Sequence, residues 1–248
     1  MIDLHCHIIP GVDDGSADPY ESLRMGEAAV SCGVTDIIVT PHCNIPGSYG
    51  NYMGPWYDRA IGELRTLFKE HGVGLRLHRG MEVFGTDNIG DLIDQDDVIT
   101  LAASRYMLVE FDFDDDMWRV RDVLRDIKRR GITPIIAHPE RYYAVNDDIQ
   151  FALDWVDMGC LLQLNRTSVL GLDTREAAYT ARRLLELGAA HFIASDAHGT
   201  FMRSTELIDA YDYVSETVSK EAAELLTSEN PRRVLENRPV LPMGKREY

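Results

Sequence analysis

The sequence predicts an α/β protein whose mainly parallel sheet closes, or nearly closes, into a barrel. Short runs rich in β-branched residues alternate with longer amphipathic segments, which is the pattern of strand–helix–strand units. Seven such runs occur without a repeat, a low-complexity tract or a Pro/Ser-rich linker, and 248 residues are a common length for one barrel domain. A doubly wound open sheet is the alternative arrangement.

The expected strands are the short apolar runs, taken in chain order. They cover Met1–Cys6, Asp36–Val39, Gly74–Glu82, Tyr106–Glu110, Thr133–Ala137, Cys160–Leu164 and His191–Ala194. The expected helices have apolar residues at helical spacing, and several precede a glycine suited to a helix C-terminus. They cover Tyr20–Ser31, Trp56–Glu70, Trp118–Arg130, Asp148–Met158 and Thr174–Leu187. The stretch after Phe201 is typical of terminal helices, with Pro231 at a helix start.

Composition and charge exclude several classes of protein. The formal net charge of −16 repels nucleic acids and anionic lipid, and no local basic patch offsets it. No apolar run approaches the roughly 18 residues of a membrane span, and the N-terminus lacks the features of a signal peptide. Four scattered cysteines without a CxxC pair favour a reduced state. We therefore expect a cytoplasmic protein with no nucleic-acid partner and no membrane insertion.

The chemical signal begins at His5-Cys6-His7 in the first expected strand. Because side chains alternate along a strand, His5 and His7 share one face and can hold one cation. Five further strands finish in an imidazole or a carboxylate, namely His42, Glu82, Glu110, His138 and Asp196, with His198 two positions on. In a parallel barrel these C-terminal ends converge on one face. The sixth strand departs from the pattern, because it offers only Gln163 and Asn165.

A cluster of this composition predicts a metal site. Asp13 and Asp14, in the first loop, can reach the same mouth of the barrel. Without cations, a buried group of acids and imidazoles is costly because like charges repel in a low dielectric. Mixed nitrogen and oxygen ligands suit Mn²⁺, Fe²⁺ or Zn²⁺, and the absence of thiolates argues against a structural zinc site.

At these residues the chain resembles the PHP (polymerase and histidinol phosphatase) family. The shared motifs are His5-Cys6-His7, Thr40-Pro41-His42, Glu82, Ala137-His138-Pro139-Glu140-Arg141-Tyr142 and Ser195-Asp196-Ala197-His198. It is more closely similar to the bacterial protein-tyrosine phosphatases of the CpsB/CapC/YwqE type. With these it shares Val12-Asp13-Asp14-Gly15, Glu110, Asp157-Met158-Gly159-Cys160 and Asn230-Pro231-Arg232. The resemblance implies a distorted (β/α)7 TIM-like barrel that forms one PHP-type phosphoesterase domain over residues 1–248, with the active site at the C-terminal strand ends.

The same resemblance implies three divalent metal ions, often manganese, with Fe or Zn as alternatives. One ion would be bound by His5, His7, Glu82 and Asp196. A second would be bound by Glu82 as a bridge, Glu110 and His138, and a third by Asp14, His42 and His198. Histidinol phosphatases typically carry His where this chain has Glu110, which favours the tyrosine-phosphatase branch.

Two arginines are the expected phosphate-binding residues. Arg141 and Arg203 match the family positions, and a guanidinium pairs with a phosphoryl group through two hydrogen bonds. A cysteine-based mechanism is rejected, although Cys160 and Arg166 have the C-x5-R spacing. The residues between them are apolar and strand-like, and an extended chain would separate the pair by roughly 20 Å.

Three functions fit the sequence. The favoured one is a phosphotyrosine-protein phosphatase that acts on the tyrosine-rich tail of a bacterial tyrosine kinase in capsule or exopolysaccharide synthesis. The second is a small-molecule phosphatase or phosphodiesterase, such as a histidinol phosphatase, and the third is a non-enzymatic metal-binding module. Loop 44–56 is equally typical of a lid, a substrate platform or a surface loop. The sequence does not reveal the metal, the physiological substrate, a general acid or the oligomeric state.

Overall fold

The strands are parallel throughout, as expected for a barrel of strand–helix units. The computed structural model describes residues 1–244. Its strands are β1 (Ile2–Cys6), β2 (Asp36–Val39), β3 (His42–Cys43), β4 (Arg76–Arg79), β5 (Glu82–Phe84), β6 (Tyr106–Glu110), β7 (Thr133–Ala137), β8 (Leu161–Asn165) and β9 (Phe192–Ala194). All pairings between these described strands are parallel.

The strands form two sheets that together close the barrel. One sheet has the order β1-β2-β4 and the other the order β3-β5-β6-β7-β8-β9. Since β3 continues β2 and β5 continues β4 along the chain, the nine segments are seven strand runs. The last run returns to the first: Cys6 bridges to Ala197, and the Asp196 N–H donates to the His5 carbonyl at 2.9 Å. This seam (the Cys6–Ala197 bridge with its neighbouring hydrogen bonds) favours the barrel over the open sheet.

The expected strand Gly74–Glu82 is wrong in its continuity. The structure begins it at Arg76 and interrupts it at Gly80-Met81. The cause is Tyr57 of helix α2 (Pro55–Glu70), whose hydroxyl donates to the Gly80 carbonyl at 2.6 Å and accepts from the Gly80 N–H at 2.9 Å. A Cβ at position 80 would lie 2.6 Å from the Ile38 side chain, so glycine is required for this close approach.

The helices agree with the expected segments and add shorter ones. They are α1 (Pro19–Ser31), α2 (Pro55–Glu70), α3 (Ile89–Asp94), α4 (Met117–Arg129), α5 (Tyr143–Asp147), α6 (Gln150–Asp157), α7 (Arg166–Val169), α8 (Arg175–Glu186), α9 (Ile208–Thr217), α10 (Lys220–Glu224) and α11 (Asn230–Leu235). The side chains of Asp18, Asp116 and Thr174 cap α1, α4 and α8 by accepting first-turn N–H groups. Pro231 lies in the first turn of α11, as predicted. Helices α3, α5 and α7 are too short to give a periodic signal.

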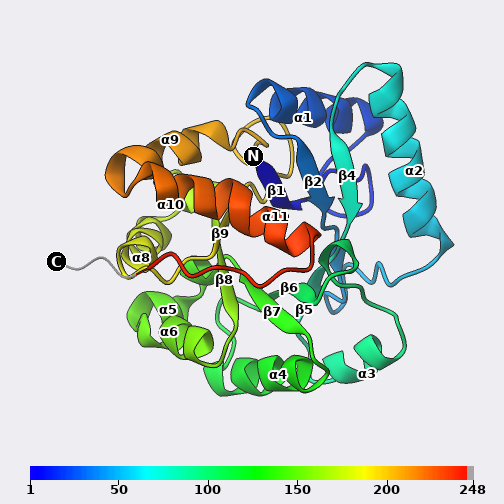
Figure 1. Ribbon diagram of the computed structural model, residues 1–248. Coiled ribbons are helices and arrows are strands. Elements are labelled where there is room, and N and C mark those ends of the chain that lie inside the picture. The colour runs from blue at the N-terminus through cyan, green and yellow to red at the C-terminus, as the bar shows by residue number, and fades with distance from the viewer. Residues whose placement is uncertain (245–248) are drawn as a thin grey trace.

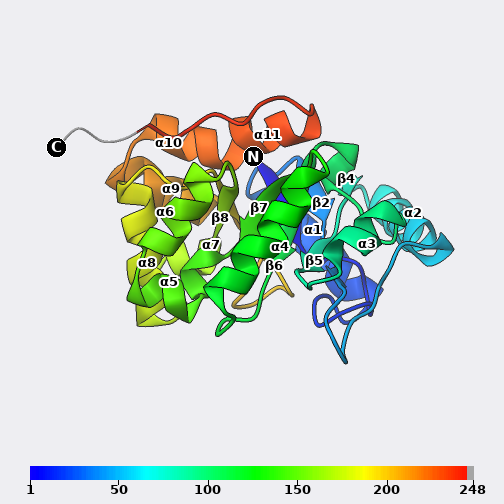
Figure 2. The same ribbon diagram turned by 90° about the horizontal axis from the view of Figure 1, so that it is seen from below.

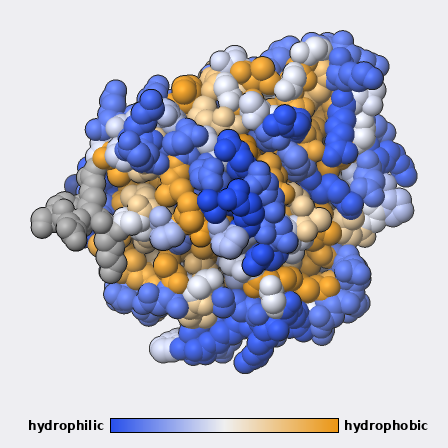
Figure 3. Space-filling view, in the orientation of Figure 1, coloured by the Kyte–Doolittle hydropathy of each residue, from blue (hydrophilic) through white to orange (hydrophobic). Residues whose placement is uncertain are grey.

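The C-terminal helices cover the end of the barrel where the strands begin. Figure 1 shows α10 and α11 in front of the strands, and Figure 2 shows them lying along one side of the barrel. Val234 of α11 packs into an apolar cluster with alternate residues of the strands, including Leu4, Leu108 and Phe192. Hydrophilic side chains cover the middle of this outer face, over α11 (Figure 3). Among the described helices, none is both long and apolar enough to cross a membrane.

Candidate metal centre

Every side chain predicted at a strand end lies at one mouth of the barrel, opposite α11. The nine positions lie on or after six of the seven strand runs and approach one another through ring nitrogens and carboxylate oxygens. They are His5, His7, Asp14, His42, Glu82, Glu110, His138, Asp196 and His198. The structure therefore brings these nine side chains together at one mouth.

Glu82 is at the centre of this cluster and is fully buried. Its Oε1 lies 3.2 Å from His5 Nε2 and 3.1 Å from His138 Nε2. Its Oε2 lies 3.2 Å from His7 Nε2 and 3.0 Å from His42 Nδ1. One carboxylate thus faces four imidazoles, which is the environment of a bridging ligand.

Asp196 forms a second anionic point beside the first strand. Its Oδ1 lies 3.3 Å from His5 Nε2 and 3.6 Å from His198 Nδ1. Its Oδ2 lies 2.5 Å from Nη2 of Arg203 and 3.8 Å from Nη1 of Arg141. The two predicted phosphate-binding arginines therefore lie at the edge of the cluster, on the side of Asp196 away from the imidazoles.

The outer part of the cluster is more open to solvent. Asp14 Oδ1 lies 3.3 Å from His42 Nε2 and 3.4 Å from His198 Nε2, and its side chain is 52% exposed. Glu110 Oε1 lies 2.8 Å from His42 Nδ1, and the other Glu110 oxygen is 3.8 Å from His138. Solvent and a substrate can therefore approach from the Asp14 side.

Within residues 1–244, several buried atoms of the cluster approach one another at ion-pair distance without a hydrogen bond of good geometry, which fits bound cations. These atoms are His42 Nδ1, His198 Nε2, Glu82 Oε2, Glu110 Oε1 and Asp196 Oδ1. Buried polar atoms are rarely left unpaired, because each costs its desolvation free energy. Nitrogen and oxygen donors at these separations match the ligand preference of Mn²⁺, Fe²⁺ and Zn²⁺.

Residues 1–244 contain three groups that could each hold an ion, and within each group the donor atoms lie within 4.8 Å of one another. They are His5, His7 and Asp196; His42, Glu82 and Glu110; and His7, Asp14, His42 and His198. The first and third contain the sets that the family resemblance implies, apart from Glu82 in the first. The second differs, because His42 takes the place expected for His138. His42 lies between two groups, with Nδ1 toward Glu110 and Nε2 toward Asp14.

Neighbouring charges favour the ionised forms of Glu82 and Asp196 despite their burial. Burial raises the pKa of Glu82, but the neighbouring His5 and His42 outweigh it and hold that pKa well below its usual range. Burial likewise opposes ionisation of Asp196, yet His5 and Arg203 lower its pKa well below the usual value. For Glu110 the balance is reversed, because burial and the charge of Glu82 raise its pKa.

Two of these positions have an unusual backbone. His138 has φ 34° and Asp196 has φ 49°, so both lie in the left-handed region that non-glycine residues seldom adopt. Each immediately follows a strand run, β7 or the Phe192–Ser195 segment, and the left-handed residue turns the chain there. Such conformations are retained where the surrounding structure requires them, and they concentrate at functional sites.

Residues beyond the predicted set also contact the cluster. Asp13 Oδ2 is 2.8 Å from His7 Nδ1 and accepts the backbone N–H of His42 at 3.0 Å. Gln163 Oε1 is 2.8 Å from His5 Nδ1, and Tyr49 stacks on His42 with centroids 5.8 Å apart. Asp13 was expected at the mouth, but the sequence did not identify which residues it contacts there. The aromatic character of loop 44–56 was the only signal for Tyr49. The neutral amide of Gln163 carried no signal for a role.

The rejected cysteine mechanism is also contradicted by the structure. Strand β8 separates Cys160 from Arg166, and the Arg166 guanidinium pairs with Asp209. Burial raises the pKa of the Cys160 thiol to about 12, which disfavours the thiolate that such chemistry requires.

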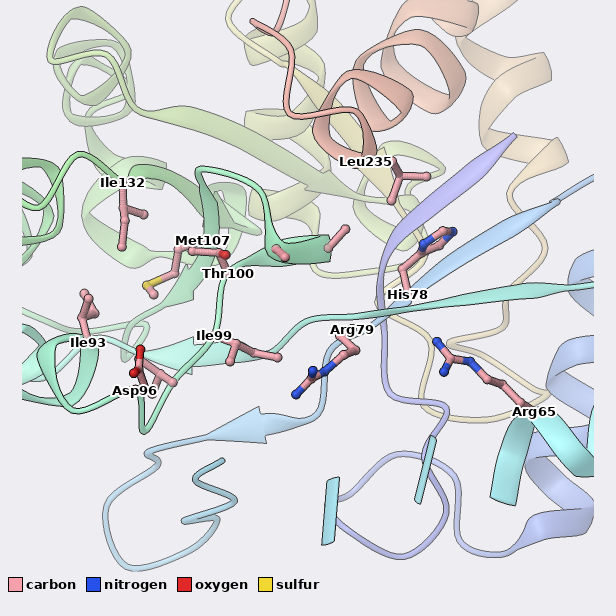
Figure 4. Close-up of a pocket in the computed structure, with 13 residues that line it drawn as sticks. Arg65, His78, Arg79, Ile93, Asp96, Ile99, Thr100, Met107, Ile132 and Leu235 are labelled. Atoms are coloured by element: carbon pink, nitrogen blue, oxygen red, sulfur yellow. The ribbon is translucent and has the colours of Figure 1, made fainter. Parts of the chain in front are cut away.

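Two hollows differ in their relation to the cluster. One, of about 460 Å³, lies beside Arg141 and is walled by Phe113 and Tyr143, so it adjoins the mouth. The other, of about 480 Å³, is lined by Met107 near the start of β6 and by Ile132 just before β7. Figure 4 shows Ile93, Met107 and Ile132 gathered at one end of it. None of the nine cluster residues lines this second hollow, so it is separate from the chemistry of the mouth.

Comparison with known proteins identifies relatives along nearly the whole chain. The tyrosine-protein phosphatase YwqE of Bacillus subtilis is 31% identical over 240 residues, covering 97% of this chain and 93% of that protein. The tyrosine-protein phosphatase CpsB of Streptococcus pneumoniae is 31% identical over 244 residues, covering 95% and 98%. A lactonase structure from Listeria monocytogenes, at 11% identity and a TM-score of 0.62 with 96% and 95% covered, shares the fold alone.

The structural and family comparisons agree with these relatives. A crystal structure described as YwqE and CpsB, metal-dependent tyrosine phosphatases, superposes with a TM-score of 0.91 at 30% identity, covering 98% of this chain and 97% of that one. The profile of the family described as capsular polysaccharide synthesis, CpsB/CapC, matches residues 1–236. The chain belongs to the CpsB/CapC family.

Proposed function

We propose that this protein is a metal-dependent phosphatase that hydrolyses phosphotyrosine in proteins and acts as one PHP-type domain. The observation that carries the proposal is the group of buried imidazole nitrogens and carboxylate oxygens that face one another around Glu82, which bound cations would satisfy. The relatives named as tyrosine phosphatases support the choice of substrate. Glu110 occupies the position where histidinol phosphatases typically have His, which supports the same choice.

The proposed centre holds three divalent ions, preferably manganese. The ligands are the nine residues of the mouth: His5, His7, Asp14, His42, Glu82, Glu110, His138, Asp196 and His198. Glu82 is proposed as the bridging ligand, since both of its oxygens face two imidazoles each. The separation between His138 and Glu110, 3.8 Å at the closest, leaves room for an ion between them.

When bound, such ions supply Lewis acidity and a nucleophilic water at neutral pH. Arg203 is held by Asp196 through Nη2 and through a 3.1 Å bond from Nε to the Asp196 carbonyl. Its Nη1 makes no hydrogen bond within residues 1–244, so it can donate to a phosphate oxygen. Arg141 stacks on Phe113, with its guanidinium carbon 4.7 Å from the ring centroid. The two guanidinium groups are thus oriented to bind the phosphoryl group from the same side of the cluster.

The leaving group and the partner follow from the same proposal. A tyrosine phenol has a pKa of about 10, so it leaves more readily than an alkyl alcohol and needs less help from a general acid. We propose the phosphotyrosine tail of a bacterial tyrosine kinase as the partner, in control of capsule or exopolysaccharide synthesis. The family description refers to capsular polysaccharide synthesis, which supports this pathway. A cytoplasmic location stays a prediction from the sequence.

The test is a phosphatase assay of protein loaded with Mn²⁺ or Zn²⁺. The substrates are a phosphotyrosine peptide, histidinol phosphate and a simple aryl phosphate. We expect metal-dependent hydrolysis with kcat/KM at least about tenfold higher for the peptide than for histidinol phosphate. The opposite preference would indicate a small-molecule phosphatase, and inactivity on all three substrates would indicate a binding module.

A further inference from the structure

The one strand run that ends without a charged residue carries two amides in contact with the metal-site residues. Gln163 and Asn165 are two positions apart on β8, so they share a face of the strand. Their exposed fractions are 0% and 1%. Buried amides must find hydrogen-bond partners, and these two find them at His5 and Asp196.

The amides connect those two residues through three consecutive hydrogen bonds. His5 Nδ1 lies 2.8 Å from Gln163 Oε1. Gln163 Nε2 donates to Asn165 Oδ1 at 2.9 Å, and Asn165 Nδ2 donates to Asp196 Oδ2 at 2.6 Å. The Asn165 backbone is anchored too, because its N–H donates to Glu140 Oε1 at 2.7 Å.

The direction of every bond follows from the charge of Asp196. An ionised carboxylate only accepts, so Asn165 must turn its NH₂ toward Asp196 and its oxygen toward Gln163. That oxygen requires the NH₂ of Gln163, which leaves the Gln163 oxygen facing the ring of His5. An amide oxygen only accepts, so His5 Nδ1 must carry a hydrogen.

We infer that Gln163 and Asn165 are positioning residues that hold His5 in the Nδ1–H tautomer, so that the lone pair of Nε2 points at the metal. The inference rests on the proposed metal centre. His5 Nε2 lies 3.2 Å from Glu82 Oε1 and 3.3 Å from Asp196 Oδ1, on the side of the ring away from Gln163. Partners of this kind fix ring orientation and donor strength in metal-binding histidines.

Asp196 therefore acts at both ends of the connection. Its Oδ2 orients the two amides, while its Oδ1 faces the nitrogen that those amides keep free of a proton. The same hydrogen bonds therefore orient both the Asp196 carboxylate and the His5 imidazole as ligands. Strand β8, which offers no metal ligand, contributes by orienting Asp196, just after its neighbour β9, and His5 on β1, which meets that segment at the seam.

The tautomer can be measured directly in ¹⁵N-labelled protein loaded with Zn²⁺. Long-range ¹⁵N–¹H spectra distinguish the two tautomers, and the His5 signals are assigned by their absence in His5→Gln. We expect a protonated Nδ1 and an unprotonated Nε2 at His5. A His5 ring protonated at Nε2 in zinc-loaded protein would overturn the inference without any variant of β8.

Two substitutions at Gln163 test the connection itself. Gln163→Leu removes the acceptor, and we expect affinity for the ion at His5 to fall by about 10–100-fold, the range known for such partners. Gln163→Glu keeps an acceptor for His5, so it should retain the Nδ1–H tautomer and bind zinc more tightly than Gln163→Leu. Gln150→Leu, at an exposed position on α6, is the matched control and should bind zinc like the wild type.

Zinc titration against a chromophoric chelator separates the possible failures. If the wild-type protein holds no zinc tightly, the proposed metal centre is wrong and the inference falls with it. If the wild type and a folded Gln163→Leu variant bind zinc equally well, the metal centre stands and the role of β8 is wrong. A folded state is checked by circular dichroism of each variant.

Discussion

Two buried histidines at opposite ends of the barrel, His191 and His7, are in opposite chemical states. His191 directly precedes strand β9, and within residues 1–244 no acidic side chain pairs with it; its Nδ1 accepts the Leu162 N–H at 3.2 Å. Burial lowers the pKa of His191 to about 4. At the mouth end of the barrel, His7 is equally buried, but hydrogen bonds to Asp13, Asp196 and Glu82 outweigh burial and raise its pKa well above the usual value.

The difference shows that burial alone does not make a histidine a ligand candidate. A buried imidazole without acids stays neutral and serves packing and one hydrogen bond, as His191 does. The same ring among carboxylates is part of a site whose charges require cations. Strand β6 repeats the contrast in two residues of one face, since Leu108 lies in the apolar interior cluster and Glu110 lies at the mouth.

The largest expected effect follows removal of the central carboxylate. We predict that Glu82→Ala lowers kcat by more than about 10³-fold while the fold is retained, because four imidazoles lose their shared acid. The measurement is metal-loaded turnover of a phosphotyrosine peptide, with circular dichroism as a check on folding. Glu63→Ala, on the exposed face of α2, is the control. Undiminished turnover in Glu82→Ala would show that the mouth is not the active site.

The apolar layer below the mouth should behave in the opposite way. Leu108→Ala is expected to lower the free energy of unfolding by about 2–5 kcal/mol, since it leaves a cavity at a fully buried position. Turnover per folded molecule should stay close to that of the wild type. Urea denaturation gives the first quantity and an assay normalised to folded protein gives the second. A large loss of kcat with unchanged stability would mean that the two layers are not separate in function.

His191 should make a pH-dependent contribution to the free energy of unfolding. The folded pKa of about 4 lies below the ordinary 6.5, so the unfolded chain binds the proton more readily between these values. Stability from this residue is complete above pH 6.5 and falls as the pH drops toward 4, by about 1–3 kcal/mol. His191→Asn lacks this component, so the difference in unfolding free energy between wild type and variant should shrink as the pH drops from 6.5 toward 4. His71→Asn, at an exposed position, should leave it in place.

The smallest expected effect lies at the rim of the mouth. Tyr49 stacks on His42 at an interplanar angle of 8°, and aromatic contacts of this kind contribute about 0.5–1.5 kcal/mol. We expect Tyr49→Ala to raise KM for a phosphotyrosine peptide about two- to tenfold, with little change in unfolding free energy. Tyr179→Ala, an exposed tyrosine on α8, is the control. An unchanged KM would assign loop 44–56 to the ordinary surface.

The sequence predicted the mouth because parallel strands have a fixed direction. His42, Glu82 and Glu110 each end an apolar run, and parallel pairing carries all such ends to one face. The prediction needed no knowledge of individual contacts. Arg203 was expected at the site from family positions alone, and the structure places it beside Asp196.

The parts that were missed depend on contacts between distant segments. The break at Gly80 comes from the hydroxyl of Tyr57, which no local pattern of strand propensity contains. The role of Gln163 depends on a histidine in another strand, and a neutral amide looks the same in sequence whether it faces solvent or a ligand. The left-handed turn at His138 is a local feature, but it is set by the packing around it.

The seam of the barrel ties ligand formation to synthesis of the chain. Asp196 and His198 become available only after β9 has been made, and the Asp196 N–H then bonds to the carbonyl of His5 near the start of the sequence. Contacts so distant in sequence form late, since a long loop must close first. If the metal centre is as proposed, a partly synthesised chain that ends at β8 carries the imidazoles of its first strand. It lacks the Asp196 carboxylate, so its ligand set is incomplete. Uptake of ions would then mark the moment at which a newly made molecule has joined its first strand to its last.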